Sequence, residues 1–191
     1  MSWIGIRYAV VVRSARLPHM DSETLAQKLS AVSQLSGEFR LRSGLMADTY
    51  FDKYQFESDP ELLRAIALEL LPLIPSDTEL LAGLELGGVP VCTALSLASG
   101  LPAVFVRKKA KDYGTAKLAE GPAIEGRRLL VVEDVVTTGG QVVLSTKDLR
   151  ERGAVVSTAL CVIDREQGGG DILAAEGIEL RATFTRSQIE R

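Results

Sequence analysis

The chain has 191 residues, a length that fits one domain of ordinary size. Hydrophobic residues make up 46% and charged residues 25%, a balance typical of globular proteins that excludes disordered and fibrous classes. The formal net charge of −3 predicts no general attraction to nucleic acid, and no apolar run reaches the roughly 18 residues that a membrane helix needs. Any anion-binding site must therefore come from a local cluster of charges.

The two cysteines and the single histidine argue against a protein-held metal site. Cys92 and Cys161 lie in apolar segments without CxxC or Cys–His spacing, so we expect two buried thiols. His19 is the only histidine, which excludes a site with several histidine ligands. A metal ion, if one is used, is expected to arrive with a substrate.

Residues 1–20 stand outside the periodic pattern that follows them. They carry three arginines and no acid, but their apolar stretch is short and ends without a cleavage pattern, so no secretory signal is expected. We interpret them as an N-terminal extension of a cytoplasmic protein, with Met20 as a second possible start.

Residues 21 to about 57 predict a small N-terminal unit, called the hood below. Leu25 and Leu29 recur at helical spacing, and the side chain of Asp21 or Ser22 can cap the helix. Two short strands around a turn near Gly44 are expected to follow.

From residue 58 to about 185 the chain predicts a core of alternating helices and strands. Asp59 precedes Pro60, which combines a capping side chain with a proline in the first helical turn. The apolar strands that follow alternate with helical segments, so we predict an α/β fold with a mainly parallel central sheet flanked by helices. Hood and core together form one predicted domain over residues 21–191, and its ligands should lie beyond the carboxyl ends of the strands. The predicted strands are 79–86, 102–107, 128–133, 154–164 and 178–184.

The middle strand of this series is predicted to end in two adjacent carboxylates, Glu133 and Asp134, and the run Thr137-Thr138-Gly139-Gly140 follows. Breaking up a buried charge pair costs about 3 to 5 kcal/mol, so such acids need partners. Glycines let the backbone approach a ligand, and the next helix points its free N–H groups at the loop. We interpret the run as a phosphate-binding loop, with acids that bind sugar hydroxyls and stabilise positive charge on the sugar.

A basic run follows the strand at 102–107. Arg107, Lys108, Lys109 and Lys111 precede a polar stretch that contains several glycines. Such a run is either a solvated loop or a lid that closes over a polyphosphate, and its place at a strand end favours the lid.

Two further sites have open interpretations. Gly87 and Gly88 precede a helix, either as a second backbone anion site or as a simple turn. Arg165 can bind a planar carboxylate with its guanidinium, or form an exposed ion pair with Asp164 or Glu166. Position alone does not decide between the two for Arg165.

Several of these segments together resemble one family. The run VVEDVVTTGG at 131–140 resembles the phosphoribosyl pyrophosphate (PRPP) motif of type I phosphoribosyltransferases. The segments RKKAKDYG, FRLRSG with YFD after it, and DREQGG look like the orotate phosphoribosyltransferase branch. The likeness covers the chain from about residue 22 to 183.

The resemblance implies transfer of the ribose 5-phosphate group from PRPP to orotate, which gives orotidine 5′-monophosphate and pyrophosphate in pyrimidine (UMP) biosynthesis. It implies that Glu133 and Asp134 hold the ribose hydroxyls and that Thr137, Thr138, Gly139 and Gly140 bind the 5′-phosphate. It implies that Arg107, Lys108 and the catalytic Lys111, with Tyr113 beside them, bind pyrophosphate, and that Gly87 and Gly88 bind it through their backbone. It implies that Arg165 binds the carboxylate of orotate. Arg42, Tyr50 and Phe51 would line the base and pyrophosphate side.

The resemblance also implies a cofactor and a partner. Mg²⁺ would be carried by PRPP, with any protein contact through water, and a homodimer would let the lid around Lys111 reach the neighbouring subunit. The chain departs from the family pattern at Tyr113, where many relatives have histidine, and tyrosine titrates near 10, too high for acid–base work at neutral pH. It also has Leu86-Gly87-Gly88 where some relatives have Tyr-Lys-Gly, which leaves backbone amides to bind pyrophosphate, and Arg42 in place of a lysine.

Two other functions share parts of this pattern. A purine-type phosphoribosyltransferase shares the phosphate loop but binds an uncharged base, which Arg165 and the FRLRSG segment disfavour. A non-catalytic regulator with the same fold should show a basic face or an added winged-helix segment, and the net charge of −3 disfavours it.

Overall fold

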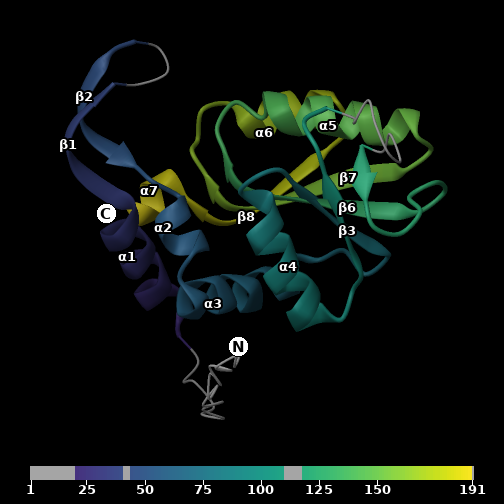
Figure 1. Ribbon diagram of the computed structural model, residues 1–191, viewed down its shortest axis with the longest axis horizontal. Coiled ribbons are helices and arrows are strands. Elements are labelled where there is room, and N and C mark those ends of the chain that lie inside the picture. The colour runs from purple at the N-terminus through teal and green to yellow at the C-terminus, as the bar shows by residue number, and fades with distance from the viewer. Residues whose placement is uncertain (1–19, 41–43, 110–117, 191) are drawn as a thin grey trace, which may run out of the picture.

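The computed structural model describes residues 20–40, 44–109 and 118–190, and the structural statements below concern these residues (Figure 1). The predictions for residues 1–19, Arg42, Lys111 and Tyr113 lie outside the described residues.

A six-stranded sheet forms the centre of the molecule, in the order β5-β4-β3-β6-β7-β8. Neighbouring strands are parallel except β5, which runs antiparallel to β4 at one edge. The predicted mainly parallel sheet is therefore confirmed. The strands are β3 (Leu80–Leu84), β4 (Ala103–Val106), β5 (Ala119–Glu120), β6 (Arg128–Val136), β7 (Val155–Asp164) and β8 (Glu179–Thr185).

Helices cover both faces of this sheet, and the strands alternate between two cores. Leu130 and Val132 of β6 pack into the core under α1, α3 and α4, whereas Leu129 and Val131 pack into the core under α5 and α6 (Figure 1). Because successive strand side chains point to opposite faces, a strand buried on both faces is apolar throughout. The helices are α1 (Ser22–Ser33), α3 (Pro60–Leu70), α4 (Gly88–Ser99), α5 (Gly140–Glu151) and α6 (Gly169–Ala175).

The predicted helix starts of the N-terminal half are confirmed by their caps. The Oδ1 atom of Asp21 accepts a hydrogen bond from the Thr24 N–H at 2.8 Å. The Oδ1 atom of Asp59 accepts one from the Glu61 N–H at 2.8 Å, next to Pro60 in the first turn. Both carboxylates satisfy helix N–H groups that have no partner inside the helix.

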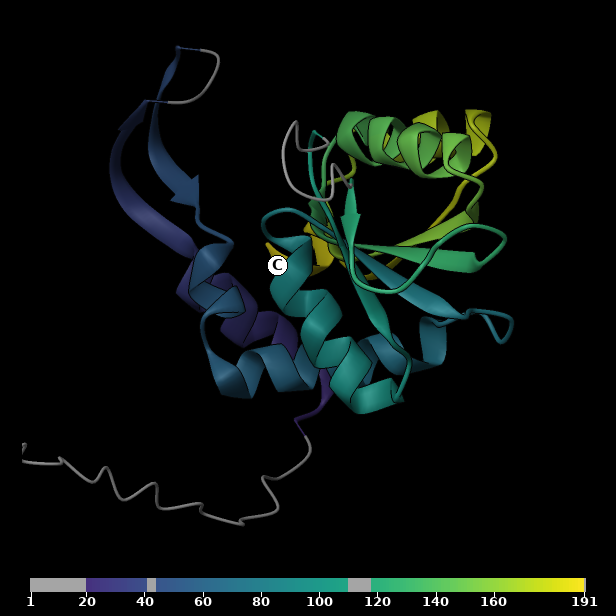
Figure 2. The ribbon, with the colours of Figure 1, turned by 45° about the vertical axis from the view of Figure 1, so that its right-hand side comes forward.

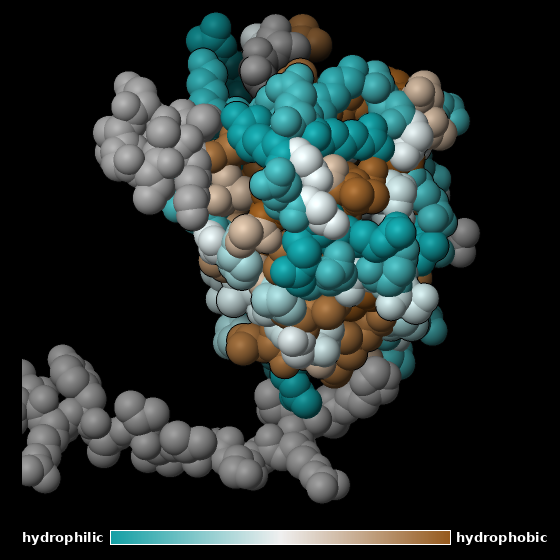
Figure 3. Space-filling model, turned by 90° about the vertical axis from the view of Figure 1, so that its right-hand side faces the viewer, coloured by the Kyte–Doolittle hydropathy of each residue, from teal (hydrophilic) through white to brown (hydrophobic). Residues whose placement is uncertain are grey.

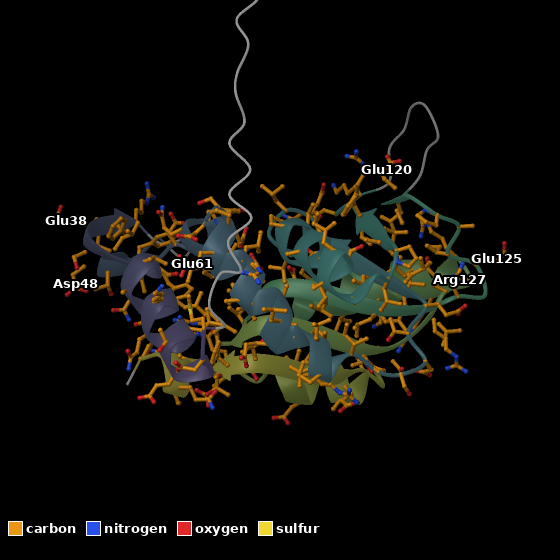
Figure 4. The ribbon with its side chains drawn as sticks, turned by 90° about the horizontal axis from the view of Figure 1, so that it is seen from below. Glu38, Asp48, Glu61, Glu120, Glu125 and Arg127 are labelled. Atoms are coloured by element: carbon orange, nitrogen blue, oxygen red, sulfur yellow. The ribbon has the colours of Figure 1, made fainter. Side chains whose placement is uncertain are left out.

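The hood consists of α1, an antiparallel pair of strands and the short helix α2 (Tyr54–Glu57). The pair, β1 (Gln34–Arg40) and β2 (Met46–Phe51), projects away from the central sheet (Figures 1 and 2). Seen from below, Glu38 and Asp48 of this pair lie at the opposite end of the molecule from Glu125 and Arg127 (Figure 4). α2 thus lies between an extended hairpin and the core.

One sequence prediction about β6 is wrong. The strand does not end at Glu133 and Asp134 but continues to Val136. β7 extends alongside it and pairs with it at Val135↔Ile163 and Val136↔Asp164. Main-chain pairing with a long neighbouring strand carries the strand past its charged residues. The short elements α2, β5, η1 (Leu71–Leu73) and α7 (Arg186–Ile189) were also not predicted.

The described residues agree with two further expectations. Cys92 and Cys161 are fully buried free thiols, and burial raises both pKa values, that of Cys92 to about 12. No described helix combines the length and apolar character needed to cross a membrane. On the face seen in Figure 3, hydrophobic side chains lie in small groups between hydrophilic ones.

Candidate active site

The predicted site residues of the core gather at the carboxyl-terminal edge of the sheet, where β3, β6 and β7 end. Gly87 follows β3, Asp134 and the run 137–140 belong to the end of β6, and Arg165 follows β7. Since neighbouring parallel strands end at the same edge, separate chain segments meet there.

The loop after β6, Thr137–Gly140, is called the phosphate loop. Gly139 lies at the start of α5 with φ 75°, a left-handed conformation that favours glycine. The free N–H groups of the first turn of α5 face this loop. A cavity of about 270 Å³ opens here, lined by Glu133 and the residues of the loop.

The phosphate loop is supported by a second glycine segment that the sequence analysis left without a role. A Cβ on Gly169 would lie 2.6 Å from the carbonyl oxygen of Thr137, closer than real Cβ atoms come. A Cβ on Gly139 would lie 3.2 Å from the Gly169 carbonyl oxygen. Gly169 therefore lets the two loops pack backbone against backbone.

Four side chains form what we call the carboxyl cluster: Lys53, Glu57, Glu133 and Asp134. Asp134 is only 1% exposed and forms an ion pair with Lys53 of the hood. Its Oδ1 atom accepts a hydrogen bond from the Val135 N–H at 2.6 Å. The partner that a buried carboxylate needs is thus an ammonium group from another part of the chain.

Glu57 is the second buried acid of the cluster, at 6% exposure. Neither of its carboxyl oxygens accepts a hydrogen bond from a donor of the described residues. The carboxyl group that lies beside it is that of Asp134. Two carboxyl groups can share a hydrogen bond only when one of them carries a proton.

Burial and neighbouring charges separate the pKa values of the three acids. Burial raises the pKa of Glu57 to about 9, with further contributions from the hydrogen bond and charge of Asp134. Burial and the charge of Asp134 raise the pKa of Glu133 to about 8. Burial also acts to raise the pKa of Asp134, but the hydrogen bond from Glu57 and the charge of Lys53 outweigh it, so this pKa is lowered. At neutral pH the cluster therefore holds Asp134 ionised and Glu57 protonated.

The absence of a side chain at Gly87 leaves room for the carboxyl cluster. A Cβ on Gly87 would lie 1.7 Å from Asp134 Oδ2 and 2.8 Å from Glu57 Oε1. A Cβ on Gly88 would lie 2.3 Å from the carbonyl oxygen of Val132. Both glycines are therefore required by close packing of the start of α4 against β6, whatever they bind.

The basic run is described only in its first part. Arg107 Nε lies 3.3 Å from Glu120 Oε1, and the Lys108 N–H donates to Glu85 Oε1 at 2.6 Å. Glu85 thus connects the loop after β3 to the start of the basic run.

Arg165 lines a second cavity and has neither of the ion-pair partners considered from the sequence. Its guanidinium lies 3.5 Å from Glu190 Oε1, with its central carbon 5.2 Å from the centroid of the Phe51 ring. The cavity measures about 560 Å³ and borders both the hood and the phosphate loop. Its lining includes Tyr50, Phe51, Lys53, Thr137, Arg165, Arg186 and Glu190.

The loop that carries Arg165 is held by its neighbour Glu166. Glu166 Oε2 accepts hydrogen bonds from the Ser187 N–H at 2.8 Å and the Ser187 hydroxyl at 2.5 Å. These bonds lower the pKa of Glu166. The contact ties the loop after β7 to α7, which brings Arg186 and Glu190 to the cavity.

Sequence reasoning did not identify Lys53, Glu57, Gly169, Arg186 or Glu190. The glycine run was a visible signal for Gly169. The other four are ordinary charged residues in or beside the short helices α2 and α7, and no local pattern distinguishes them from solvated ones.

Comparison with known proteins gives a consistent result. A family model described as phosphoribosyl transferase domain matches residues 60–180. An orotate phosphoribosyltransferase of Nocardioides sp. is 52% identical over 167 residues, which covers 87% of this chain and 93% of that protein. One of Halobacterium salinarum is 47% identical over 153 residues, which covers 80% and 87%. The crystal structure of Mycobacterium tuberculosis orotate phosphoribosyltransferase with Fe(III) dicitrate has a TM-score of 0.81 and 32% identity, and the match covers 89% of this chain and 99% of that one.

Proposed function

Because the chain belongs to the phosphoribosyl transferase family, in its orotate phosphoribosyltransferase branch, we propose that it transfers the ribose 5-phosphate group of PRPP to orotate. The products are orotidine 5′-monophosphate and pyrophosphate, as in pyrimidine biosynthesis. One observation carries the assignment of the site: the phosphate loop, the carboxyl cluster and the Arg165 cavity meet at one edge of the sheet.

The phosphate loop and the adjacent acids fit the ribose phosphate. We assign the 5′-phosphate to the N–H groups and hydroxyls of Thr137–Gly140, where the positive end of α5 favours an anion. Asp134 and Glu133 then face the sugar. Departure of pyrophosphate leaves positive charge on the anomeric carbon, which the ionised Asp134 stabilises, and the same charge favours ionisation of Glu133.

The Arg165 cavity fits the base. A planar guanidinium binds a carboxylate through two parallel hydrogen bonds, and orotate carries such a carboxylate. The Phe51 ring beside Arg165 offers a flat apolar surface for a pyrimidine ring. An uncharged purine would leave the guanidinium without a counterpart from the substrate, which favours orotate.

The leaving pyrophosphate needs positive charge. We assign Arg107 and Lys108 to it, with Lys111 and Tyr113 on the segment outside the described residues, and the amides at Gly87 and Gly88. Mg²⁺ bound to PRPP would neutralise the pyrophosphate oxygens. No group of three acids, cysteines or histidines among the described residues is placed to hold a metal ion.

The remaining assignments extend the resemblance. Arg42, Tyr50 and Phe51 would line the base and pyrophosphate side, and the active unit would be a homodimer whose lid around Lys111 serves the neighbouring subunit. The cytoplasmic location stays a prediction.

The test of the function is an assay of orotate consumption. Protein, PRPP, Mg²⁺ and orotate are mixed and the loss of orotate absorbance is followed, with hypoxanthine, guanine and uracil in parallel. We expect turnover when orotate is the base and none with the other three bases. Turnover with a purine base but not with orotate would contradict the assignment.

Arg165→Ala tests the orotate site. Because hydrogen bonds to charged groups contribute about 1.5–3 kcal/mol, the KM for orotate should rise roughly 10- to 100-fold. The KM for PRPP should change less than about twofold. Arg128→Ala, which removes an exposed arginine paired with Asp77 at 3.2 Å, is the control and should change neither value. An equal rise in both KM values would exclude Arg165 as the carboxylate ligand.

A further inference from the structure

Glu57 is a buried acid for which the reaction as described has no use. It lies in α2 of the hood, far in sequence from the strand that carries Asp134. Its carboxyl group is 6% exposed and receives no hydrogen bond from an N–H or hydroxyl of the described chain. A buried carboxyl group of this kind destabilises a protein unless it has a specific partner.

The partner of Glu57 is the catalytic carboxylate. Asp134 Oδ2 and Glu57 Oε1 both lie against the position that a Cβ of Gly87 would occupy. The same Oδ2 atom pairs with the Lys53 ammonium. Asp134 is therefore held between an acid from one end of α2 and a cation from the other.

The charged groups around Glu57 are those of the carboxyl cluster. Lys53 acts on it from the start of α2, and Asp134 and Glu133 act from β6. α1 and α3 also pack against α2. Their charged residues are Glu23, Lys28, Glu61, Arg64 and Glu69, of which Lys28 and Glu61 pair with each other at 3.0 Å on the exposed surface. With Asp134 ionised beside it, a second negative charge on Glu57 would be unfavourable in this buried place.

We propose that Glu57 is a positioning residue that, in its protonated form, donates a hydrogen bond to Asp134 opposite Lys53 and so holds this carboxylate toward the ribose of PRPP. The role of Asp134 at the ribose rests on the proposed function above. The proposed hydrogen bond itself does not, since it joins two groups of the protein and needs no substrate.

A protein-held metal ion is a weaker explanation of the same acids. The described residues contain no group of three potential ligands arranged around a metal ion. The Lys53 ammonium already provides the positive charge at Asp134 Oδ2.

Two variants of Glu57 separate positioning from packing. Glu57→Gln keeps the size and a permanent N–H donor, whereas Glu57→Leu keeps the volume without a donor. Glu61→Gln, on the exposed surface of α3, is the matched control. Since small misplacement of a catalytic group can reduce a rate up to ~10²-fold, Glu57→Leu should lower kcat/KM for PRPP by about 10- to 100-fold at pH 7. Glu57→Gln should lose less than about threefold.

The pH profile gives a readout that a packing role would not change. In the wild type, kcat/KM for PRPP should fall as Glu57 loses its proton near its pKa of about 9. Glu57→Gln has no proton to lose, so this part of the decline should disappear, while Glu61→Gln should keep it. Equal activity of the Gln and Leu variants, or an unchanged decline in Glu57→Gln, would overturn the proposal.

Thermal unfolding without substrate tests the hydrogen bond independently of the reaction. The folded protein keeps the Glu57 proton between its ordinary pKa of 4.5 and about 9, whereas the unfolded chain loses it. Stability from this group is therefore complete below pH 4.5 and is lost as the pH rises toward 9. The Tm of Glu57→Gln should fall less between pH 5 and 9 than that of the wild type.

The two experiments fail in different ways. Absence of orotate turnover in the wild type contradicts the proposed function and leaves the unfolding comparison valid. Parallel Tm curves for the wild type and Glu57→Gln contradict a protonated Glu57, even in an active enzyme. If Glu57→Leu does not fold, Glu57→Gln still tests the proposal through the pH dependence of its kcat/KM and of its Tm.

Discussion

The phosphate loop and the carboxyl cluster lie side by side at the same edge of the sheet but are built in opposite ways. The loop is one continuous run, Thr137–Gly140, and the groups proposed to bind phosphate are backbone N–H groups at the start of α5. The cluster joins Lys53 and Glu57 of the hood to Glu133 and Asp134 of β6. A contiguous run can specify a phosphate site by itself, whereas the charge state of an acid depends on residues that only the fold brings near.

This difference also separates what each region does for the substrate. In the proposed reaction the backbone N–H groups would bind a phosphate that is present before and after the transfer, so they would contribute to affinity. The ionised Asp134 would face charge that develops only as the bond to pyrophosphate breaks, so it would contribute to the rate. Substitutions in the two regions should therefore change different kinetic constants.

The largest effect is expected for Asp134→Asn, which removes the negative charge of the Asp134 carboxylate and keeps the shape of the side chain. Loss of one preorganised electrostatic group typically lowers kcat about 10²- to 10³-fold, and the half-buried Lys53 loses its partner. Steady-state kinetics should show this fall in kcat with a much smaller change in the KM for PRPP. Asp77→Asn, which breaks the exposed ion pair with Arg128 at the start of β6, serves as the control. A change mainly in KM would erase the distinction between the two regions.

A smaller effect, of the other kind, is expected for Gly139→Ala in the phosphate loop. A left-handed non-glycine residue costs roughly 1–2 kcal/mol, and the new Cβ would press on the Gly169 carbonyl at 3.2 Å. The KM for PRPP should rise about tenfold, with kcat changed less. Gly177→Ala is a matched control, because Gly177 has φ 67° and nothing within 4 Å of its Cβ position. It should lower Tm similarly without weakening PRPP binding, and equal KM values in the two variants would contradict the role of the loop.

The smallest effect is expected for Glu190→Gln at the Arg165 cavity, where the tertiary structure again supplies a distant partner. Glu190 pairs with Arg165 at 3.5 Å and with Arg186 at 2.7 Å. If Arg165 binds orotate as proposed, the Glu190 carboxylate competes with that of orotate. Partly exposed ion pairs contribute about 0.2–1 kcal/mol, which corresponds to a fall of about 1.4- to fivefold in the KM for orotate. Glu179→Gln, which breaks the exposed pair with Arg181, should leave it unchanged. A rise in KM would show that Glu190 orients Arg165 for binding.

Much of the fold could be predicted because its signals are local. Asp21 and Asp59 cap the helices that they were expected to start, and the apolar runs form the strands of a mainly parallel sheet. The short helices α2 and α7 could not be predicted, since four residues are too few to show a helical period. The end of β6 was misplaced because pairing with β7, a contact far in sequence, outweighs the local charge of Glu133 and Asp134.

The sequence by itself determined the sheet, the phosphate loop and the two acids beside it, because hydrophobic period, glycine conformation and helix N–H groups depend on residues close along the chain. Only the tertiary structure decided that Lys53 and Glu57 enclose Asp134 and that Glu190 pairs with Arg165. The physical reason is that a pKa or an ion pair depends on distance and burial in space, which separation along the chain does not specify.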